Sequence, residues 1–93
     1  MAVAIIMEIG ATEEQYDAVN EKIDPSGNPP EGLIIHVGSV TDSGIKVIDV
    51  WESEQQFMDF RESRLGPAVA EVMGEDAGPP NIQVLELHDV IKP

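Results

Sequence analysis

The sequence contains no cysteine, few basic residues and no long hydrophobic run, and each shortage excludes a class of protein. Without cysteine there is no disulfide framework, no thiolate metal site and no thiol chemistry. The apolar run at residues 2–9 is far too short to span a bilayer, and no basic segment of a secretory signal accompanies it. We therefore expect a cytoplasmic protein whose residues 1–93 form a single domain.

The shortage of basic residues also restricts the partners of this chain. Five basic residues stand against 18 acidic ones, which gives a formal net charge of −13. Nucleic acids and anionic membranes are poor partners for such a chain, because it repels their phosphates at every approach. The acids are spread along the whole chain, which is typical of a solvated surface. The sequence therefore predicts neither nucleic-acid binding nor membrane binding.

The predicted elements follow the order β-α-β-β-α-β, and the two halves share one plan. Each half has a β-branched run, a capping box of the form S/T-x-x-Q, a helix and a loop with a proline pair before the next strand. The predicted strands are residues 2–9, 33–40, 45–51 and 82–91, and the predicted loops are 24–32 and 75–81. Two such halves predict an α+β, ferredoxin-like sandwich with four antiparallel strands and both helices on one face.

The predicted helices begin at the capping boxes Thr12-Glu13-Glu14-Gln15 and Ser53-Glu54-Gln55-Gln56. The first runs for about three turns to Ile23. The second is expected to run from 54 to about 64 and to resume from 67 to 73. Gly66-Pro67 is expected to interrupt it, because proline lacks an amide donor and clashes with the preceding turn.

Helices on one face leave the other face of the sheet to be explained. We assign the more apolar alternate residues of each strand to the helix side. That set is Val3, Ile5, Met7, Leu33, Ile35, Val37, Ile48, Val50, Leu85 and Leu87. The outer face then carries Ala4, Ile6, Glu8, Ile34, His36, Val40, Val47, Asp49, Trp51, Val84, Glu86 and His88. Because exposed apolar residues favour aggregation, we expect two copies to pack sheet against sheet as a homodimer.

The segment VIDVWESEQQFMDF at residues 47–60 resembles the dimeric α/β-barrel superfamily that includes antibiotic biosynthesis monooxygenase-like domains. Members typically end their third strand in a V-W-x-S-x-x-x-F-like pattern, which Val50, Trp51, Ser53 and Phe57 match. The chain is most similar to small stand-alone members with no assigned activity. The resemblance implies a ferredoxin-like protomer, a dimer whose sheets face each other, and a pocket between sheet and helices.

The resemblance also allows two activities of the superfamily to be weighed. The haem-degrading branch has a second tryptophan and a haem-binding histidine where this chain has Phe60 and Ala70, so haem degradation is not implied. The cofactor-free monooxygenase branch oxidises electron-rich phenols or quinols, which supply the electrons themselves. Such a site needs an aromatic pocket with groups that hold and deprotonate a phenol. We therefore expect no cofactor.

The candidate site residues are two histidines, one aspartate and two aromatic residues. His36 and Asp49 are the candidate catalytic pair, because an imidazole accepts protons near neutral pH and a carboxylate orients it. Trp51, Tyr16 and His88 are candidate substrate-binding residues. Each also has a purely structural interpretation: a histidine bonded at the dimer interface, an aspartate paired with a basic residue, or an aromatic ring in the core or plugging the interface.

Three functional hypotheses stay open on the sequence alone. The first is a homodimer that binds a small apolar or aromatic molecule, with a cofactor-independent, monooxygenase-like activity. The second is a non-catalytic dimeric binding or stress-response module. The third is a metal-assisted enzyme that uses His36 and His88. It is the weakest, because the two histidines lack the local spacing of metal ligands, and no metal ligand is assigned.

Overall fold

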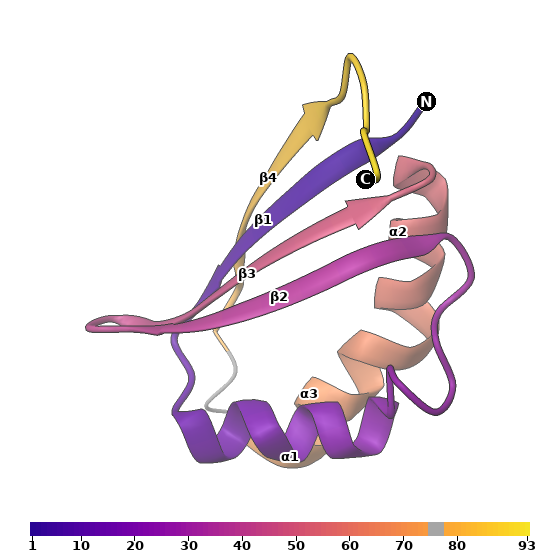
Figure 1. Cartoon of the computed structure of the whole chain (residues 1–93). Coiled ribbons are helices and arrows are strands. Elements are labelled where there is room, and N and C mark those ends of the chain that lie inside the picture. The colour runs from indigo at the N-terminus through magenta and orange to yellow at the C-terminus, as the bar shows by residue number, and fades with distance from the viewer. Residues whose placement is uncertain (75–77) are drawn as a thin grey trace.

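The computed structural model describes residues 1–74 and 78–93, and in them a four-stranded antiparallel sheet is covered by helices on one face (Figure 1). Its strands are β1 (Val3–Ile9), β2 (Leu33–Thr41), β3 (Gly44–Trp51) and β4 (Asn81–Glu86), in the order β2-β3-β1-β4. The predicted ferredoxin-like βαββαβ fold is confirmed. Residues 75–77 of the predicted loop 75–81 lie outside the described residues.

Helix α1 (Glu13–Ile23) begins at the predicted capping box. The Thr12 hydroxyl accepts a hydrogen bond from the Gln15 amide at 3.1 Å, and the Gln15 side chain accepts one from the Thr12 amide at 2.9 Å. Two amides that lack partners inside the helix are thereby satisfied. The second box forms only in part: Ser53 caps the Gln56 amide, but the Gln56 side chain bonds the Ser53 hydroxyl instead of its amide.

The predicted break at Gly66-Pro67 is wrong, because the chain from Glu54 to Met73 is one continuous helix. It consists of α2 (Glu54–Phe60), a π-helical segment η1 (Arg61–Leu65) and α3 (Gly66–Met73). The Gly66 amide bonds the carbonyl of Arg61, five residues back. The wider π turn relieves the clash of the Pro67 ring with the preceding turn. It also lets the helix continue although proline has no amide hydrogen to donate.

The π-helical segment also holds the C-terminal end of α1. The Arg64 guanidinium donates to the carbonyl of Ile23 and, at 2.8 Å, to that of Asn28. These carbonyls lie at and beyond the end of α1, where a cation is favoured by the helix dipole. An exposed ion pair of 2.8 Å between Lys22 and Glu71 adds a link between α1 and α3. These polar contacts therefore hold the C-terminal end of α1 against the long helix.

The predicted assignment of strand residues to the helix side or the outer side of the sheet is correct for β1 and wrong for β3 and β4. Val47, Asp49 and Trp51 are 2%, 3% and 0% exposed, whereas Ile48 is 42% exposed. The register explains this, because directly opposed residues share a face and the inward β1 residues pair with these three: Val3 with Trp51, Ile5 with Asp49, Met7 with Val47. In β4, Ile82 and Val84 oppose Met7 and Ile5, so Leu85 points outward.

A β-bulge near the start of β2 reverses which residues of this strand point to the helices, from the second residue of the strand onward. The register shifts between Leu33 and Ile35, so Leu33 opposes Trp51 while His36 opposes Asp49. An extra residue in one strand exchanges the two faces beyond it. His36 therefore lies on the helix side, and Ile35 and Val37 point outward.

The outer face of the sheet is mixed, as predicted, but it carries other residues. Its apolar members are Ala4, Ile6, Ile35, Val37, Ile48, Val50 and Leu85, and its polar members are Glu8, Ser39, Lys46, Asn81 and Gln83. Strand β4 is shorter than predicted, because β1 begins at Val3, the partner of Glu86, and only one more backbone bond, from Leu87 to Ala2, follows. Within the described residues, no helix is both long and apolar enough to cross a membrane.

The capping box of α1 gives a prediction for stability. Thr12→Ala removes the hydroxyl that accepts from the Gln15 amide, and we expect it to lower the free energy of unfolding by about 1 kcal/mol. Thr12→Ser keeps the hydroxyl and should retain most of the stability. Urea unfolding of both variants measures the difference, and equal losses in the two would contradict this account of the helix start.

Candidate functional site

Trp51 lies at the centre of the core between sheet and helices. It is fully buried and packs edge-on against Phe57 at a centroid distance of 5.7 Å and tilted against Phe60 at 5.3 Å. The edge-on and tilted arrangements are those that aromatic quadrupoles prefer. Its indole N–H donates to Oδ2 of Asp49 at 3.2 Å. The tryptophan therefore belongs to the helix side and not, as predicted, to the outer face.

Asp49 is a carboxylate buried in this apolar core. Burial of a charged group is costly unless hydrogen bonds replace the lost water. Both oxygens have such a partner: Oδ2 accepts from Trp51, and Oδ1 lies 2.6 Å from Nδ1 of His36. The pairing explains how β3 can turn Asp49 inward with Val47 and Trp51.

His36 connects the buried carboxylate with the hydroxyl of Tyr16. An ionised carboxylate can only accept, so Nδ1 of His36 carries the proton that bonds Asp49. In the neutral ring this leaves Nε2 as the acceptor, and the Tyr16 hydroxyl donates to it at 2.7 Å. The side chains of Tyr16, His36, Asp49 and Trp51 thus form one hydrogen-bonded chain across three elements, α1, β2 and β3.

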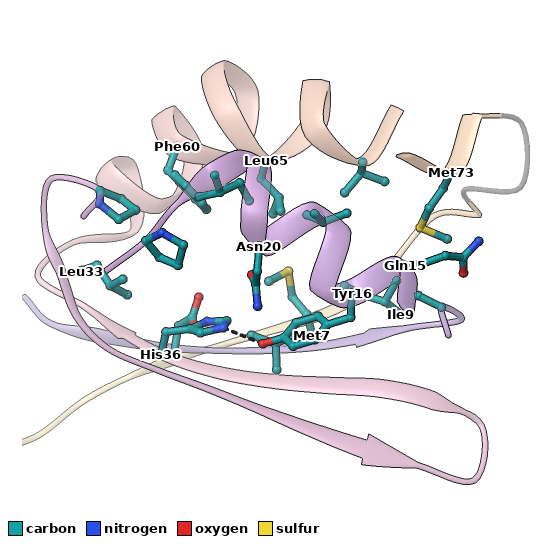
Figure 2. Close-up of a pocket in the computed structure, with 18 of the residues that line it drawn as sticks. Met7, Ile9, Gln15, Tyr16, Asn20, Leu33, His36, Phe60, Leu65 and Met73 are labelled. Carbon is teal, nitrogen blue, oxygen red and sulfur yellow. Dashed lines mark hydrogen bonds and ion pairs between the residues drawn. The ribbon is translucent and has the colours of Figure 1, made fainter. Parts of the chain in front are cut away.

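A small cavity adjoins this chain, as the close-up shows (Figure 2). Its apolar walls come from the sheet at Met7 and Val47, from α1 at Val19, and from the long helix at Phe60 and Leu65. Its volume is about 50 Å³, enough for a few water molecules and not for a ring system. His36 and the Tyr16 hydroxyl lie on the sheet side, facing the apolar walls.

The structure brings together four of the five predicted site residues: Tyr16, His36, Asp49 and Trp51 all line this cavity. His88 is not among them. It is exposed, and it follows β4 at the edge of the sheet opposite to β2, which bears His36. Three strand spacings of about 4.8 Å separate these edges, or roughly 14 Å. Within residues 1–74 and 78–93, no three His, Asp or Glu side chains gather as a metal site would require.

Two features of the site were missed by sequence reasoning. Phe60 and Leu65 form a wall, but neither was predicted as a site residue, because an apolar stripe on a helix does not tell core from cavity wall. Gly38 lies in β2 beneath the Tyr16 hydroxyl, where a Cβ atom would come within 2.1 Å of that oxygen. A glycine inside a strand is the available signal, because it often marks a close approach by another group.

Comparison with known proteins finds solved structures with the same fold. No family model and no curated protein matches the sequence. A putative antibiotic biosynthesis monooxygenase from Deinococcus radiodurans is 10% identical, with a TM-score of 0.66 and coverage of 100% of this chain and 98% of that chain. Further matches include a protein of unknown function from Nitrosomonas europaea.

Two Streptomyces enzymes also match. A monooxygenase from the gene ActVA-Orf6 of Streptomyces coelicolor, in complex with nanaomycin D, is 20% identical, with a TM-score of 0.60 and coverage of 99% and 91%. SnoaB from Streptomyces nogalater, a cofactor-independent oxygenase, is 9% identical, with a TM-score of 0.61 and coverage of 99% and 96%. Such identities show the fold alone: this chain has the ferredoxin-like fold of antibiotic biosynthesis monooxygenase-like proteins.

Proposed function

We propose that this protein binds a small, mostly apolar aromatic molecule with a phenolic hydroxyl and oxidises it with O₂ without a cofactor. One observation carries the proposal: His36 lines an apolar cavity with Nδ1 held by the buried Asp49 carboxylate and with Nε2 as an acceptor, which the phenol of Tyr16 bonds at 2.7 Å. A neutral imidazole oriented in this way is a suitable proton acceptor for a phenol. Trp51 supplies an aromatic wall beside it, and the cavity of about 50 Å³ admits a ring only when a lining side chain moves aside.

The chemistry assigned to these residues is the removal of one proton. Asp49 keeps the Nδ1 proton in place, so that Nε2 of His36 accepts the proton of the phenol and a phenolate forms. The phenolate is electron-rich and gives its electrons to O₂. For 1-naphthol the balance is one naphthol plus one O₂ giving one naphthoquinone plus one water. One oxygen atom enters the ring as a carbonyl and the other leaves as water, so no other reductant is needed.

The matched structures support the type of reaction, oxygenation without a cofactor, and not the residues. The Streptomyces coelicolor enzyme is described as a monooxygenase with bound nanaomycin D, and SnoaB as a cofactor-independent oxygenase. Each covers nearly all of this chain. The roles of His36, Asp49 and Trp51 rest instead on the hydrogen bonds and the cavity of this chain.

We further propose that the protein acts as a homodimer through the outer face of its sheet. Ile35, Val37, Ile48 and Leu85 on this face are 53%, 47%, 42% and 41% exposed in the single chain. They lie on β2, β3 and β4, and Ala4 and Ile6 of β1 join Ile48 to Leu85 as one apolar surface. A two-fold pairing of this surface buries it in both copies. The cavity on the helix side stays outside such an interface.

Asp49→Asn tests the proton acceptor with little change in shape. The introduced carboxamide can donate to Nδ1 of His36, which shifts the imidazole proton to Nε2 and leaves no acceptor for a phenol. We expect the rate of 1-naphthol oxidation to fall by about 10²-fold or more. Oxygen consumption and naphthoquinone absorbance measure the rate, across a panel of phenols and quinols.

His88→Ala is the matched control, because His88 is the other histidine of the chain and is exposed. It should keep the wild-type rate. If the wild-type protein turns over none of the panel, or if Asp49→Asn is as active as His88→Ala, catalysis by this site is refuted. Binding without turnover would favour the alternative of a non-catalytic binding module.

The dimer is tested by placing one charge on the outer face. Ile48→Lys puts an ammonium group in the apolar surface, where burial without a partner is costly, and we expect a monomer of 10.1 kDa. Gln55→Lys makes the same charge change on the exposed side of α2 and should remain dimeric. Light scattering measures both masses, and a wild-type protein that stays monomeric would contradict the proposed dimer.

A further inference from the structure

We infer that Tyr16 is an internal competitor for the phenol site, which a ligand must displace, and that this competition selects ligands with a phenolic hydroxyl. The inference rests on the proposed function for the location of the site. It adds the residue that controls entry and the chemical group that a ligand must carry.

The first argument is chemical identity. The side chain of Tyr16 is itself a phenol, and its hydroxyl already donates to Nε2 of His36 at 2.7 Å. The two rings are nearly parallel, at an angle of 21° with centroids 6.3 Å apart. Tyr16 therefore occupies the hydrogen-bonding position that the proposed function gives to the ligand's hydroxyl, as the dashed line in Figure 2 shows.

The second argument is that the sheet leaves room for the Tyr16 hydroxyl at Gly38. Gly38 is the next inward-facing residue after His36 on β2, opposite Val47. A Cβ atom at position 38 would lie 2.1 Å from the hydroxyl oxygen and 2.6 Å from Cζ of the ring. Any other residue there would push the phenol of Tyr16 away from His36. Glycine thus permits the closed position of the ring.

The third argument is that the ring of Tyr16 can leave without unfolding of α1. The helix is anchored at its C-terminal end by Arg64 and by the ion pair of Lys22 with Glu71, whereas Tyr16 lies in its first half. Tyr16 is only partly buried, and β2 is an edge strand. Rotation about the Cα–Cβ bond to another staggered rotamer is therefore a path that leaves the helix in place.

The competition has a measurable consequence for selectivity. One hydrogen bond of ordinary strength favours the closed position about fivefold, and the apparent affinity of a ligand is reduced by the same factor. A phenol restores the lost bond to Nε2 of His36. The corresponding methyl ether cannot donate, so it leaves the acceptor unbonded. We therefore expect tighter binding of 1-naphthol than of 1-methoxynaphthalene.

Two variants that open the site in different ways test the inference, by calorimetric titration with 1-naphthol in the absence of oxygen. Tyr16→Phe removes the competing hydroxyl, and Tyr16→Ala removes the hydroxyl together with its ring. Both should bind 1-naphthol about fivefold more tightly than the wild type does. Gly10→Ala is the control, because a Cβ there meets nothing within 4 Å, and its affinity should be unchanged.

Unchanged or weaker binding by Tyr16→Phe would overturn the inference, since weaker binding would make the hydroxyl part of the ligand's own site. Absence of 1-naphthol binding in the wild type and in both variants would also overturn it. Because oxygen is excluded, these outcomes are separate from a failure of the proposed oxidation, which leaves binding unaffected.

A second measurement on the wild type does not depend on the stability of any variant. Tyr16 is the single tyrosine of the chain, so its ring protons are assigned directly in a proton NMR spectrum. We expect the Overhauser contact between the Tyr16 and His36 rings to disappear when 1-naphthol saturates the protein and to be replaced by a naphthol–His36 contact. Persistence of the Tyr16–His36 contact at saturation would overturn the inference.

Discussion

The pairing of the buried Asp49 carboxylate is the interaction on which the site depends. A charge that is 3% exposed among apolar side chains needs hydrogen-bond donors, and Trp51 and His36 are the two that reach it. These bonds set the position of the indole and the tautomer of the imidazole together. Nε2 of the histidine is thereby directed at the Tyr16 hydroxyl, beside the cavity.

The helical layer closes the cavity through a local irregularity of the long helix. The π-helical turn lets the helix continue past Pro67, so that Val69 and Met73 after the proline line the cavity together with Phe60 and Leu65 before it. The same turn carries Arg64 to the carbonyl of Ile23. One departure from regular α-helix thus supports both the wall of the site and the anchoring of α1, which bears Tyr16.

The faces of the strands show where sequence reasoning succeeds and where it fails. In β1 the inward set of Val3, Ile5 and Met7 was predicted correctly, because no polar residue competes with that assignment. In β3 the residues that point to the helices include the charged Asp49. The alternate residues, Ile48 and Val50, were therefore assigned to the core. Hydrogen bonds from two other side chains reverse that preference, and no pattern within β3 indicates them.

The sequence by itself determined the order of elements, the starts of both helices and hence the ferredoxin-like fold, because capping boxes and hydrophobic periods are local. It also singled out Tyr16, His36, Asp49 and Trp51, since each is unusual in its segment. Only the tertiary structure decided that these four meet on the helix side. Their meeting depends on the β1–β3 register and on the bulge in β2, which arise from pairing between strands distant in sequence.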